Sequence, residues 1–349
     1  MQETNVQIVN RWLQSSLVLV LVLLSGGSAL AGAKYTFKVA TIAPEGSIWT
    51  KRFHDFVSEV REKSNGEIGF KIYAGGIMGD DRAMYRKMQI GQLHGGGFTM
   101  TGIGSVIPDF RVMGIPFLFQ SYDEVDKVTA GLQEYFNAAF AKKGLEFIAM
   151  TEVGFVYSMS TAPISTLQQL QHSKTWAPEG DPISTAYLDT LGITPIPLSI
   201  PDVLTSLQTG MVETVFNSLY GAIVLQWFTK TVYISDIPFG YAYGTFLLDR
   251  KKFFRLPENY RKLIKSTAKK HFDLLIQDTR TSNRESRQVL LDNGVSMVVP
   301  DPVDARKLIE KRDETVLRMG NKAFSKQSYE LTLKLLEDFR SQAAKKSSQ

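Results

Sequence analysis

The sequence predicts an α/β fold with parallel-dominated sheets, mainly from residues 173–218 and from a long helix late in the chain. Short extended runs alternate with helical runs through this stretch. In order they are 174–177 extended, 182–191 helical, 193–197 extended, 201–208 helical and 212–216 extended. Strands joined by crossover helices are typical of a parallel sheet, where ligands collect beyond the carboxyl ends of the strands. We therefore expect residues 176–181 and 216–218 to face one crevice.

The N-terminal part also alternates strands and helices. Its first extended run, YTFKVAT, alternates and is rich in β-branched and aromatic residues. Asp80 is placed to cap a helix. Three consecutive glycines from Gly95 indicate tight packing or close approach of the backbone to a ligand. The expected elements are a strand at 35–41, a helix at 48–64, a strand at 68–73, a helix at 80–90 and a glycine-rich strand and turn at 95–99.

The rest of the chain is predominantly helical. Two adjacent extended runs, 145–151 and 155–160, indicate that the chain passes between two lobes there. The apolar residues of 257–293 fit one face of a helix long enough to brace both lobes. The other expected elements are a helix or helical pair at 121–143, helices at 303–319 and 329–342, and a frayed tail from 345.

The first 31 residues have the pattern of a signal peptide. Arg11 gives a positive flank, residues 17–24 are uninterrupted Leu and Val, and a small-x-small site predicts cleavage after Ala31. The alternative, a membrane anchor, needs an apolar run of about 20 residues. The sequence of 349 residues contains no cysteine, which excludes a disulfide framework and a lipoprotein cysteine. The expected location is the periplasm.

Composition and motifs argue against several classes of function. The net charge of +5 comes from Lys and Arg interleaved with Asp and Glu, which is typical of a solvated face rather than a nucleic-acid site. The four histidines are far apart and lack metal-ligand spacing, and no phosphate-binding or hydrolase motif is present. We expect no catalytic residues, no metal and no cofactor. Glu179 and Asp181 are read as helix-capping acids or as partners of a cationic solute.

Four short segments carry a resemblance to a known family. They are GDDRAM at 79–84, KTWAP at 174–178, LQTGMVE at 207–213 and FFRLPE at 253–258. In this order and spacing the chain resembles the DctP-type solute-binding proteins of tripartite ATP-independent periplasmic (TRAP) transporters. In the third segment Glu213 stands where the family's signature has Asp.

The resemblance implies the two-lobed fold of periplasmic binding proteins, with crossing strands, a bridging helix and hinged closure over a solute. The implied first lobe is 32–153 plus about 242–282, and the second is 154–241 plus about 283–342, followed by a flexible tail at 343–349. It also implies delivery of the solute to a small and a large membrane subunit that use an ion gradient.

The chain departs from the family where relatives bind a carboxylate. Trp176 stands at the position of the usual arginine, and Val156 at that of a second arginine found in some members. Asn217 matches a hydrogen-bonding asparagine, but Phe216 replaces the neighbouring glutamate. The resemblance also makes Thr99, Tyr220, Trp49, Phe239 and Tyr243 candidate ligand-binding residues.

These departures predict an apolar or aromatic solute rather than a simple dicarboxylate, with an organic cation held against Trp176 as a second possibility. We further expect Trp176→Ala to weaken solute binding with little change in melting temperature. Alternatives remain open. Trp49 and Tyr243 are also explained as core residues, another basic side chain would allow carboxylate binding, and a sensor subunit for a membrane receptor would have the same sequence features.

Overall fold

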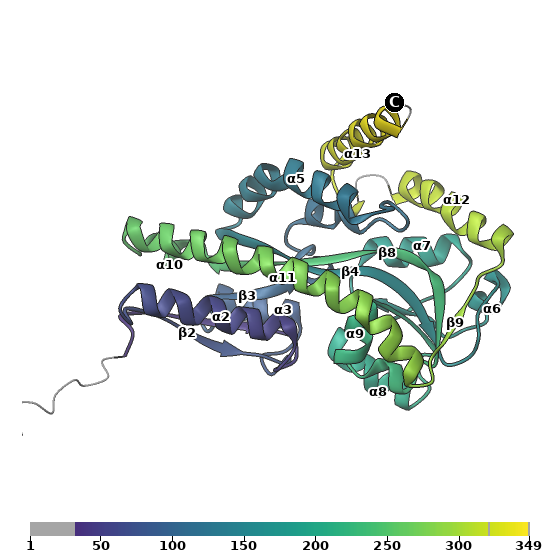
Figure 1. Ribbon diagram of the computed structural model, residues 1–349, viewed down its shortest axis with the longest axis horizontal. Coiled ribbons are helices and arrows are strands. Elements are labelled where there is room, and N and C mark those ends of the chain that lie inside the picture. The colour runs from purple at the N-terminus through teal and green to yellow at the C-terminus, as the bar shows by residue number, and fades with distance from the viewer. Residues whose placement is uncertain (1–31, 320–321, 348–349) are drawn as a thin grey trace, which may run out of the picture.

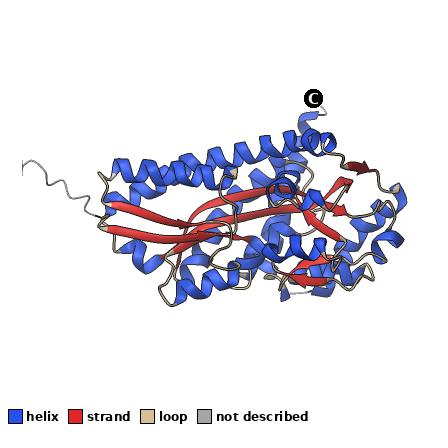
Figure 2. Ribbon diagram, turned by 90° about the horizontal axis from the view of Figure 1, so that it is seen from below, coloured by secondary structure: helices blue, strands red, loops and turns tan. Residues whose placement is uncertain are grey.

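The computed structural model describes residues 32–319 and 322–347, and the predicted signal peptide lies outside these residues. The main sheet has the strand order β2-β1-β3-β8-β4-β7, with β9 beside β8, and β5 and β6 form a separate pair. Helices cover the sheet and extend along the whole molecule (Figure 1, Figure 2). No helix in the described ranges is long and apolar enough to cross a bilayer.

The N-terminal elements agree with the sequence prediction to within one or two residues. They are β1 (Tyr35–Thr41), α2 (Ile48–Lys63), β2 (Ile68–Tyr73), α3 (Asp81–Gln89) and β3 (Gly95–Thr99). Strand β1 pairs in parallel with both β2 and β3. Asp80 caps α3 as expected, since its Oδ1 accepts a hydrogen bond of 2.8 Å from the Ala83 amide. A Cβ on Gly95 would lie 2.4 Å from the Leu247 carbonyl oxygen, so tight packing explains that glycine.

Two long antiparallel strands cross the molecule. Strand β4 (Leu145–Ser160) unites the two extended runs expected at 145–151 and 155–160, and it pairs with β8 (Tyr233–Asp249) along most of its length. The register shifts between Glu152 and Gly154, where Gly154 has a φ of 107°. The sequence did not predict β8, because Pro238, Gly240 and Gly244 interrupt its strand pattern.

The stretch at 173–218 forms only part of the parallel arrangement expected of it. Strands β5 (Trp176–Pro178) and β6 (Ile196–Leu198) pair in parallel, whereas β7 (Thr214–Asn217) pairs antiparallel with β4 in the main sheet. A sequence pattern does not reveal which neighbour a short strand selects. The helices before, within and after this stretch are α6 (Leu167–Gln171), α7 (Pro182–Thr190), η2 (Ile200–Asp202), α8 (Val203–Gln208), α9 (Leu219–Val224) and η3 (Trp227–Thr229).

The remaining helices brace the sheet. They are α4 (Met100–Ile103), η1 (Pro108–Gly114), α5 (Tyr122–Lys142), α10 (Arg250–Phe254), α11 (Glu258–Asp292), α12 (Pro302–Met319) and α13 (Lys326–Ser347), with β9 (Ser296–Val298) before α12. Helix α11 contacts α2, β4 and α9, and it runs across most of the molecule, as the predicted brace should (Figure 1). Helix α13 continues beyond the end expected at residue 342. It packs on α5 and η1, which the sequence-based division places in the other lobe.

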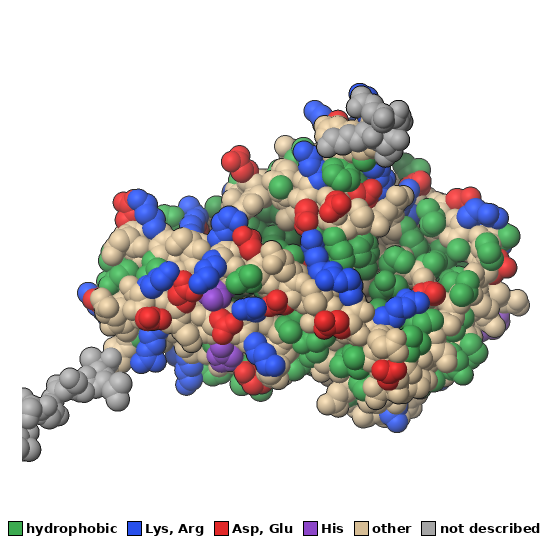
Figure 3. All heavy atoms as spheres, viewed as in Figure 1, with side chains coloured by type: hydrophobic (Ala, Val, Ile, Leu, Met, Phe, Trp, Pro, Cys, Tyr) green, Lys and Arg blue, Asp and Glu red, His purple; other side chains and the backbone are tan. Residues whose placement is uncertain are grey.

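The surface over α2 and α11 carries both signs of charge. Figure 3 shows acidic and basic side chains interleaved across this face. Several pair between the helices, such as Glu59 with Lys270 at 2.6 Å and Arg52 with Asp278 at 2.5 Å. This alternation has the character of a solvated face rather than of a continuous basic track.

Candidate functional site

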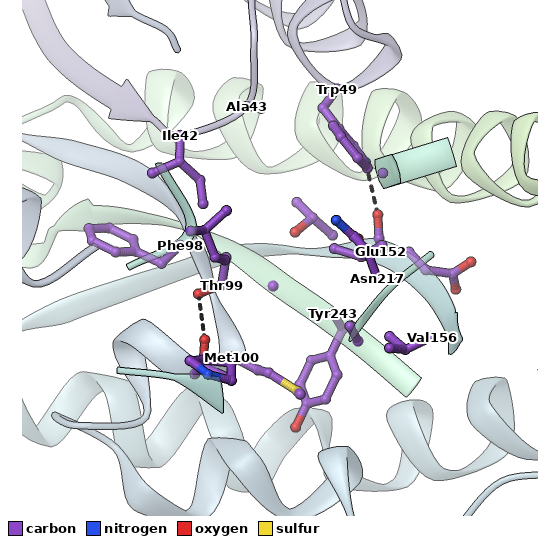
Figure 4. Close-up of a pocket in the computed structure, with 18 of the residues that line it drawn as sticks. Ile42, Ala43, Trp49, Phe98, Thr99, Met100, Glu152, Val156, Asn217 and Tyr243 are labelled. Carbon is purple, nitrogen blue, oxygen red and sulfur yellow. Dashed lines mark hydrogen bonds between the residues drawn. The ribbon is translucent and has the colours of Figure 1, made fainter. Parts of the chain in front are cut away.

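A cavity of about 230 Å³ lies between the β1–β3 part of the sheet and the β5–β7 region. Ile42 and Ala43 approach it from the loop after β1, Phe98 and Thr99 from β3, and Val156 and Asn217 from the opposite side (Figure 4). Eight of the predicted ligand-binding residues line it. They are Trp49, Thr99, Val156, Trp176, Phe216, Asn217, Phe239 and Tyr243. Their contact with a solute stays a prediction.

Tyr220, the ninth candidate, is not among the lining residues. Its hydroxyl accepts a hydrogen bond of 2.9 Å from the Ile48 amide, and its ring meets the Trp49 ring edge-on at 5.1 Å. Tyr220 therefore joins α9 to the start of α2 and supports the wall formed by Trp49.

Trp176 is both a wall residue and a core residue. Only 3% of its surface is exposed, and its Nε1 donates a 3.0 Å hydrogen bond to the Leu198 carbonyl. Its ring packs edge-on against Trp227 at 5.5 Å. Removing so buried a side chain leaves a void and an unpaired carbonyl. This burial contradicts the expectation that Trp176→Ala would leave the melting temperature nearly unchanged.

Aromatic rings form another wall of the cavity. Phe216 and Phe239 lie 4.6 Å apart between ring centroids, and Phe117 and Tyr187 pack on Phe239 from behind at 5.4 and 5.2 Å. Phe117 has a φ of 55°, an unusual value for a bulky residue, and its amide donates to the Phe239 carbonyl at 2.9 Å. The rings are therefore held in place by packing and by the backbone.

Trp49 and Tyr243 line the cavity but direct their hydrogen-bond donors elsewhere. The indole Nε1 of Trp49 donates to the Glu152 carbonyl at 2.9 Å, as the dashed line in Figure 4 shows. The Tyr243 hydroxyl donates to the Phe110 carbonyl and accepts from the Met113 amide. Each ring thus presents apolar surface to the cavity, while its polar atom is satisfied by the protein.

Glu152 is a lining residue that the sequence analysis did not identify. Only 1% of its surface is exposed, and its carboxylate accepts hydrogen bonds from Arg280 at 2.8 to 3.2 Å and from the Tyr241 hydroxyl at 2.9 Å. Burial raises the pKa of Glu152, and the Arg280 guanidinium opposes that rise. Its cation comes from α11, far away in sequence, so no local pattern could have revealed this pair.

Asp81 lies behind Thr99 on the other side of the cavity. Its Oδ1 accepts from the Thr99 amide at 3.0 Å, and its Oδ2 accepts from the Thr99 hydroxyl at 2.7 Å. Burial raises the pKa of Asp81 to about 6. The Thr99 oxygen in turn accepts from the Gly102 amide at 3.1 Å. The Thr99 hydroxyl is therefore fixed by the protein rather than free to rotate.

The cavity offers little charge to a solute. Among its lining residues, all from the described part of the chain, none is Lys, Arg or His, and Glu152 is the acidic member. Asn217 provides an amide, whose Oδ1 accepts from the Ser218 amide at 2.8 Å. Besides Thr99, the Ser and Thr residues of the lining are Thr41, Thr50, Thr101, Thr151 and Ser184. Within the described residues, no group of three or more His, Asp or Glu side chains is placed to hold a metal ion.

Comparison with known proteins assigns the chain to a family. The sequence matches the family model described as bacterial extracellular solute-binding protein, family 7 (DctP), over residues 39–323. The chain belongs to this family. Family 7 comprises the TRAP-type solute-binding proteins that the sequence motifs resemble, and its members bind small molecules rather than catalyse reactions.

Individual relatives of this family 7 protein are distant. A solute-binding protein from Chromohalobacter salexigens is 26% identical over 170 residues, which is 48% of this chain and about half the length of that protein. A TRAP periplasmic solute binding protein from Desulfovibrio salexigens, crystallised with orotic acid, is 20% identical with a TM-score of 0.80. The match covers 87% of this chain and 99% of that one.

A second structure is equally similar in fold. The sugar acid binding protein DctPAm from Advenella mimigardefordensis, in complex with galactonate, is 21% identical with a TM-score of 0.83. It covers 88% of this chain and 99% of its own. These matches confirm the two-lobed α/β fold predicted from the sequence, and at such low identity they establish the fold alone.

Proposed function

We propose that this protein is the solute-binding subunit of a TRAP-type transporter and that its solute is a small, mainly apolar or aromatic molecule rather than a simple dicarboxylate. The single observation that carries the proposal is the absence of Lys, Arg and His from the described lining of the cavity. In addition, the wall where Trp176, Phe216 and Phe239 stand is formed by rings.

The energetic argument rests on what a carboxylate would lose here. A hydrogen bond to a charged partner is worth about 1.5–3 kcal/mol, and an ion buried without one also keeps its desolvation cost. A dicarboxylate entering this cavity would meet the Asn217 amide and hydroxyl groups but no cation among the lining residues. Glu152 would repel it to the extent that Arg280 leaves its charge uncompensated. An uncharged ring avoids both costs and gains aromatic contacts worth about 0.5–1.5 kcal/mol each.

The proposal includes export and delivery. The predicted signal peptide with cleavage after Ala31 would send the chain to the periplasm, and the lack of cysteine argues against a lipid anchor. Closure of the two lobes over a solute would then present it to the small and large membrane subunits of the transporter. A sensor subunit feeding a membrane receptor would bind its solute in the same way.

A thermal-shift series tests the proposed solute class. The purified mature chain is mixed with indole as a neutral aromatic probe, and separately with succinate, malate and galactonate. We expect indole to raise the melting temperature and the dicarboxylates to leave it unchanged, because binding to the native state alone stabilises it by mass action. Phe216→Ala should reduce the indole shift. A strong shift with succinate or malate and none with indole would refute the proposed class.

A second candidate is an organic acid bound by another basic residue. The relatives crystallised with galactonate and orotic acid give this candidate its support. Arg111 is the natural residue to test, because it is buried near Tyr243 and its Nε has no hydrogen-bond partner among the described residues. A galactonate shift that disappears in Arg111→Met but persists in Arg82→Gln, with the fold retained by circular dichroism, would favour this candidate over a role of Arg111 in positioning the nearby turn.

A further inference from the structure

Two arginines, Arg82 and Arg111, contact the turn at residues 178–181. Arg82 on α3 donates from Nη1 to Glu179 Oε1 at 3.1 Å, and Arg111 on η1 donates from Nη2 to the Gly180 carbonyl at 3.2 Å. The Arg111 Nε also lies 4.0 Å from Asp181 Oδ1, with both side chains almost fully buried. The arginines belong to the predicted first lobe and the turn, residues 178–181, to the second.

The contacts lie at the edge of the solute cavity. A smaller cavity of about 30 Å³ is lined by Arg82 and Asp81 on one side and by Glu179 on the other. It shares Ile42, Thr101, Pro178 and Ile200 with the main cavity. The Arg82–Glu179 contact therefore lies beside the main cavity, against a space that shares part of its lining.

The turn is linked directly to the cavity wall. Asp181 caps α7, accepting from the Ser184 amide at 3.2 Å and from the Ser184 hydroxyl at 2.5 Å. Ser184 and Leu188 on α7 line the cavity, and so does Pro178 at the other end of the turn. A contact that fixes the turn thus also fixes part of the wall around a solute.

Gly180 has the shape that this contact requires. Its φ is 71°, and a Cβ at this position would lie 1.4 Å from Arg82 Nη2. The Arg82 guanidinium therefore lies directly against the backbone of the turn, in space that any other residue would fill.

We infer that Arg82 and Arg111 are positioning residues that hold the turn at 178–181 against the side of the cavity that Pro178 and Ser184 line. Affinity even for an uncharged solute should then depend on charge pairing outside the cavity. The inference rests on the proposed function for the choice of solute, but the contact itself does not depend on the solute class. Since Arg82 and Glu179 are partly exposed, salt should screen their attraction.

The central experiment compares Gly180→Ala with Gly210→Ala. Both glycines have a φ near 70°, but a Cβ on Gly210 would have nothing within 4 Å. Both variants therefore place an alanine at a similar positive φ, and only Gly180→Ala brings a Cβ against Arg82. Calorimetric Kd values for indole are measured at about 0.01 M and about 1 M NaCl, where the Debye lengths are about 30 and 3 Å.

We expect high salt to weaken binding to the wild type roughly two- to fivefold, in line with a partly exposed pair. Gly180→Ala should be weakened by a similar factor at low salt and lose its salt dependence. Gly210→Ala should behave like the wild type. Equal Kd values for the wild type at both salt concentrations, or equal losses in the two alanine variants, would overturn the inference.

A charge comparison on α3 gives an independent check. Arg82→Gln should reproduce the Gly180→Ala result, whereas Arg86→Gln, an exposed change on the same helix, should not. If indole fails to bind and galactonate binds, the apolar solute class is refuted. The same variants and salt series are then measured with galactonate. This distinguishes a failure of the proposed solute class from a failure of the positioning role of the arginines.

A distance measurement needs no solute. The chain has no cysteine, so a double variant with Glu62→Cys on α2 and Gln208→Cys on α8 carries spin labels at these two positions and nowhere else. We expect the labels to move apart when Gly180→Ala is added and when salt is raised, and Gly210→Ala to have no effect. Identical distance distributions in all these samples would contradict the inference.

Discussion

Two buried acids flank the cavity, and the protein treats them differently. Glu152 on β4 is paired with Arg280 from α11 and with the Tyr241 hydroxyl. Asp81 on α3 is only 7% exposed, and its carboxyl group accepts hydrogen bonds from the amide and the hydroxyl of Thr99. Burial raises the pKa of both carboxyl groups.

The difference shows two ways of keeping charge out of a solute cavity. On one side a cation from a distant helix compensates the carboxylate, and Arg280 also pairs with Asp126 at 2.6 Å. On the other side the Asp81 carboxyl group accepts hydrogen bonds from Thr99 and has no cationic partner among the described residues, and burial raises its pKa to about 6. Both arrangements leave the cavity wall to rings and hydroxyl groups, as the proposed solute class requires.

Removing Arg280 should have the largest effect. Arg280→Gln leaves Glu152 buried without its cation, and breaking such a pair typically costs about 3–5 kcal/mol. We expect the free energy of unfolding, measured by urea denaturation, to fall by about this amount. Arg284→Gln, one turn further along α11, removes a side chain whose hydrogen bond is to exposed Thr281 and should change stability by about 0.5 kcal/mol or less. Similar losses in both variants would remove the distinction between the two acids.

The second largest effect should be a dependence of folding stability on pH that is caused by Asp81. Because the folded pKa of about 6 exceeds the ordinary value of 3.8, the folded state holds this proton more tightly. The resulting stabilisation is fully present below about pH 4 and is lost as the pH rises through about 6. A pKa shift of this size corresponds to a contribution of about 3 kcal/mol to the free energy of unfolding.

Asp81→Asn removes the titration while keeping the shape of the side chain. We expect the stability of the wild type, relative to this variant, to decrease by up to about 3 kcal/mol between about pH 4 and about pH 7. Urea denaturation of both proteins at each pH measures the difference. Parallel pH profiles would mean that Asp81 is compensated as well as Glu152 is.

The smallest effect concerns the rings of the wall. Trp176→Phe keeps an apolar ring but leaves the buried Leu198 carbonyl without its donor, which should cost about 2 kcal/mol. Trp49→Phe removes the donor to the Glu152 carbonyl from a half-buried ring, so we expect about half that loss. Thermal melts measure both. A loss of indole affinity in Trp176→Phe with no change in melting temperature would assign Trp176 to solute contact instead of packing.

The sequence by itself determined most of the local structure and the family. The strands at Tyr35–Thr41 and Ile68–Tyr73 and the helix that Asp80 caps agree with their patterns, because hydrophobic period, caps and glycine stops act within a few residues. The four family motifs similarly identified the two-lobed fold. Eight of nine candidate side chains then proved to lie around one cavity.

Only the tertiary structure decided what each of these side chains does there. It turned the Trp176 indole N–H toward Leu198, supplied Glu152 with Arg280 from 128 residues away, and brought Arg82 to the turn at Gly180. It also formed β8 despite its proline and glycines, since pairing with β3 and β4 satisfies that backbone. Burial, charge compensation and strand partners depend on contacts between distant segments, and no local pattern encodes them.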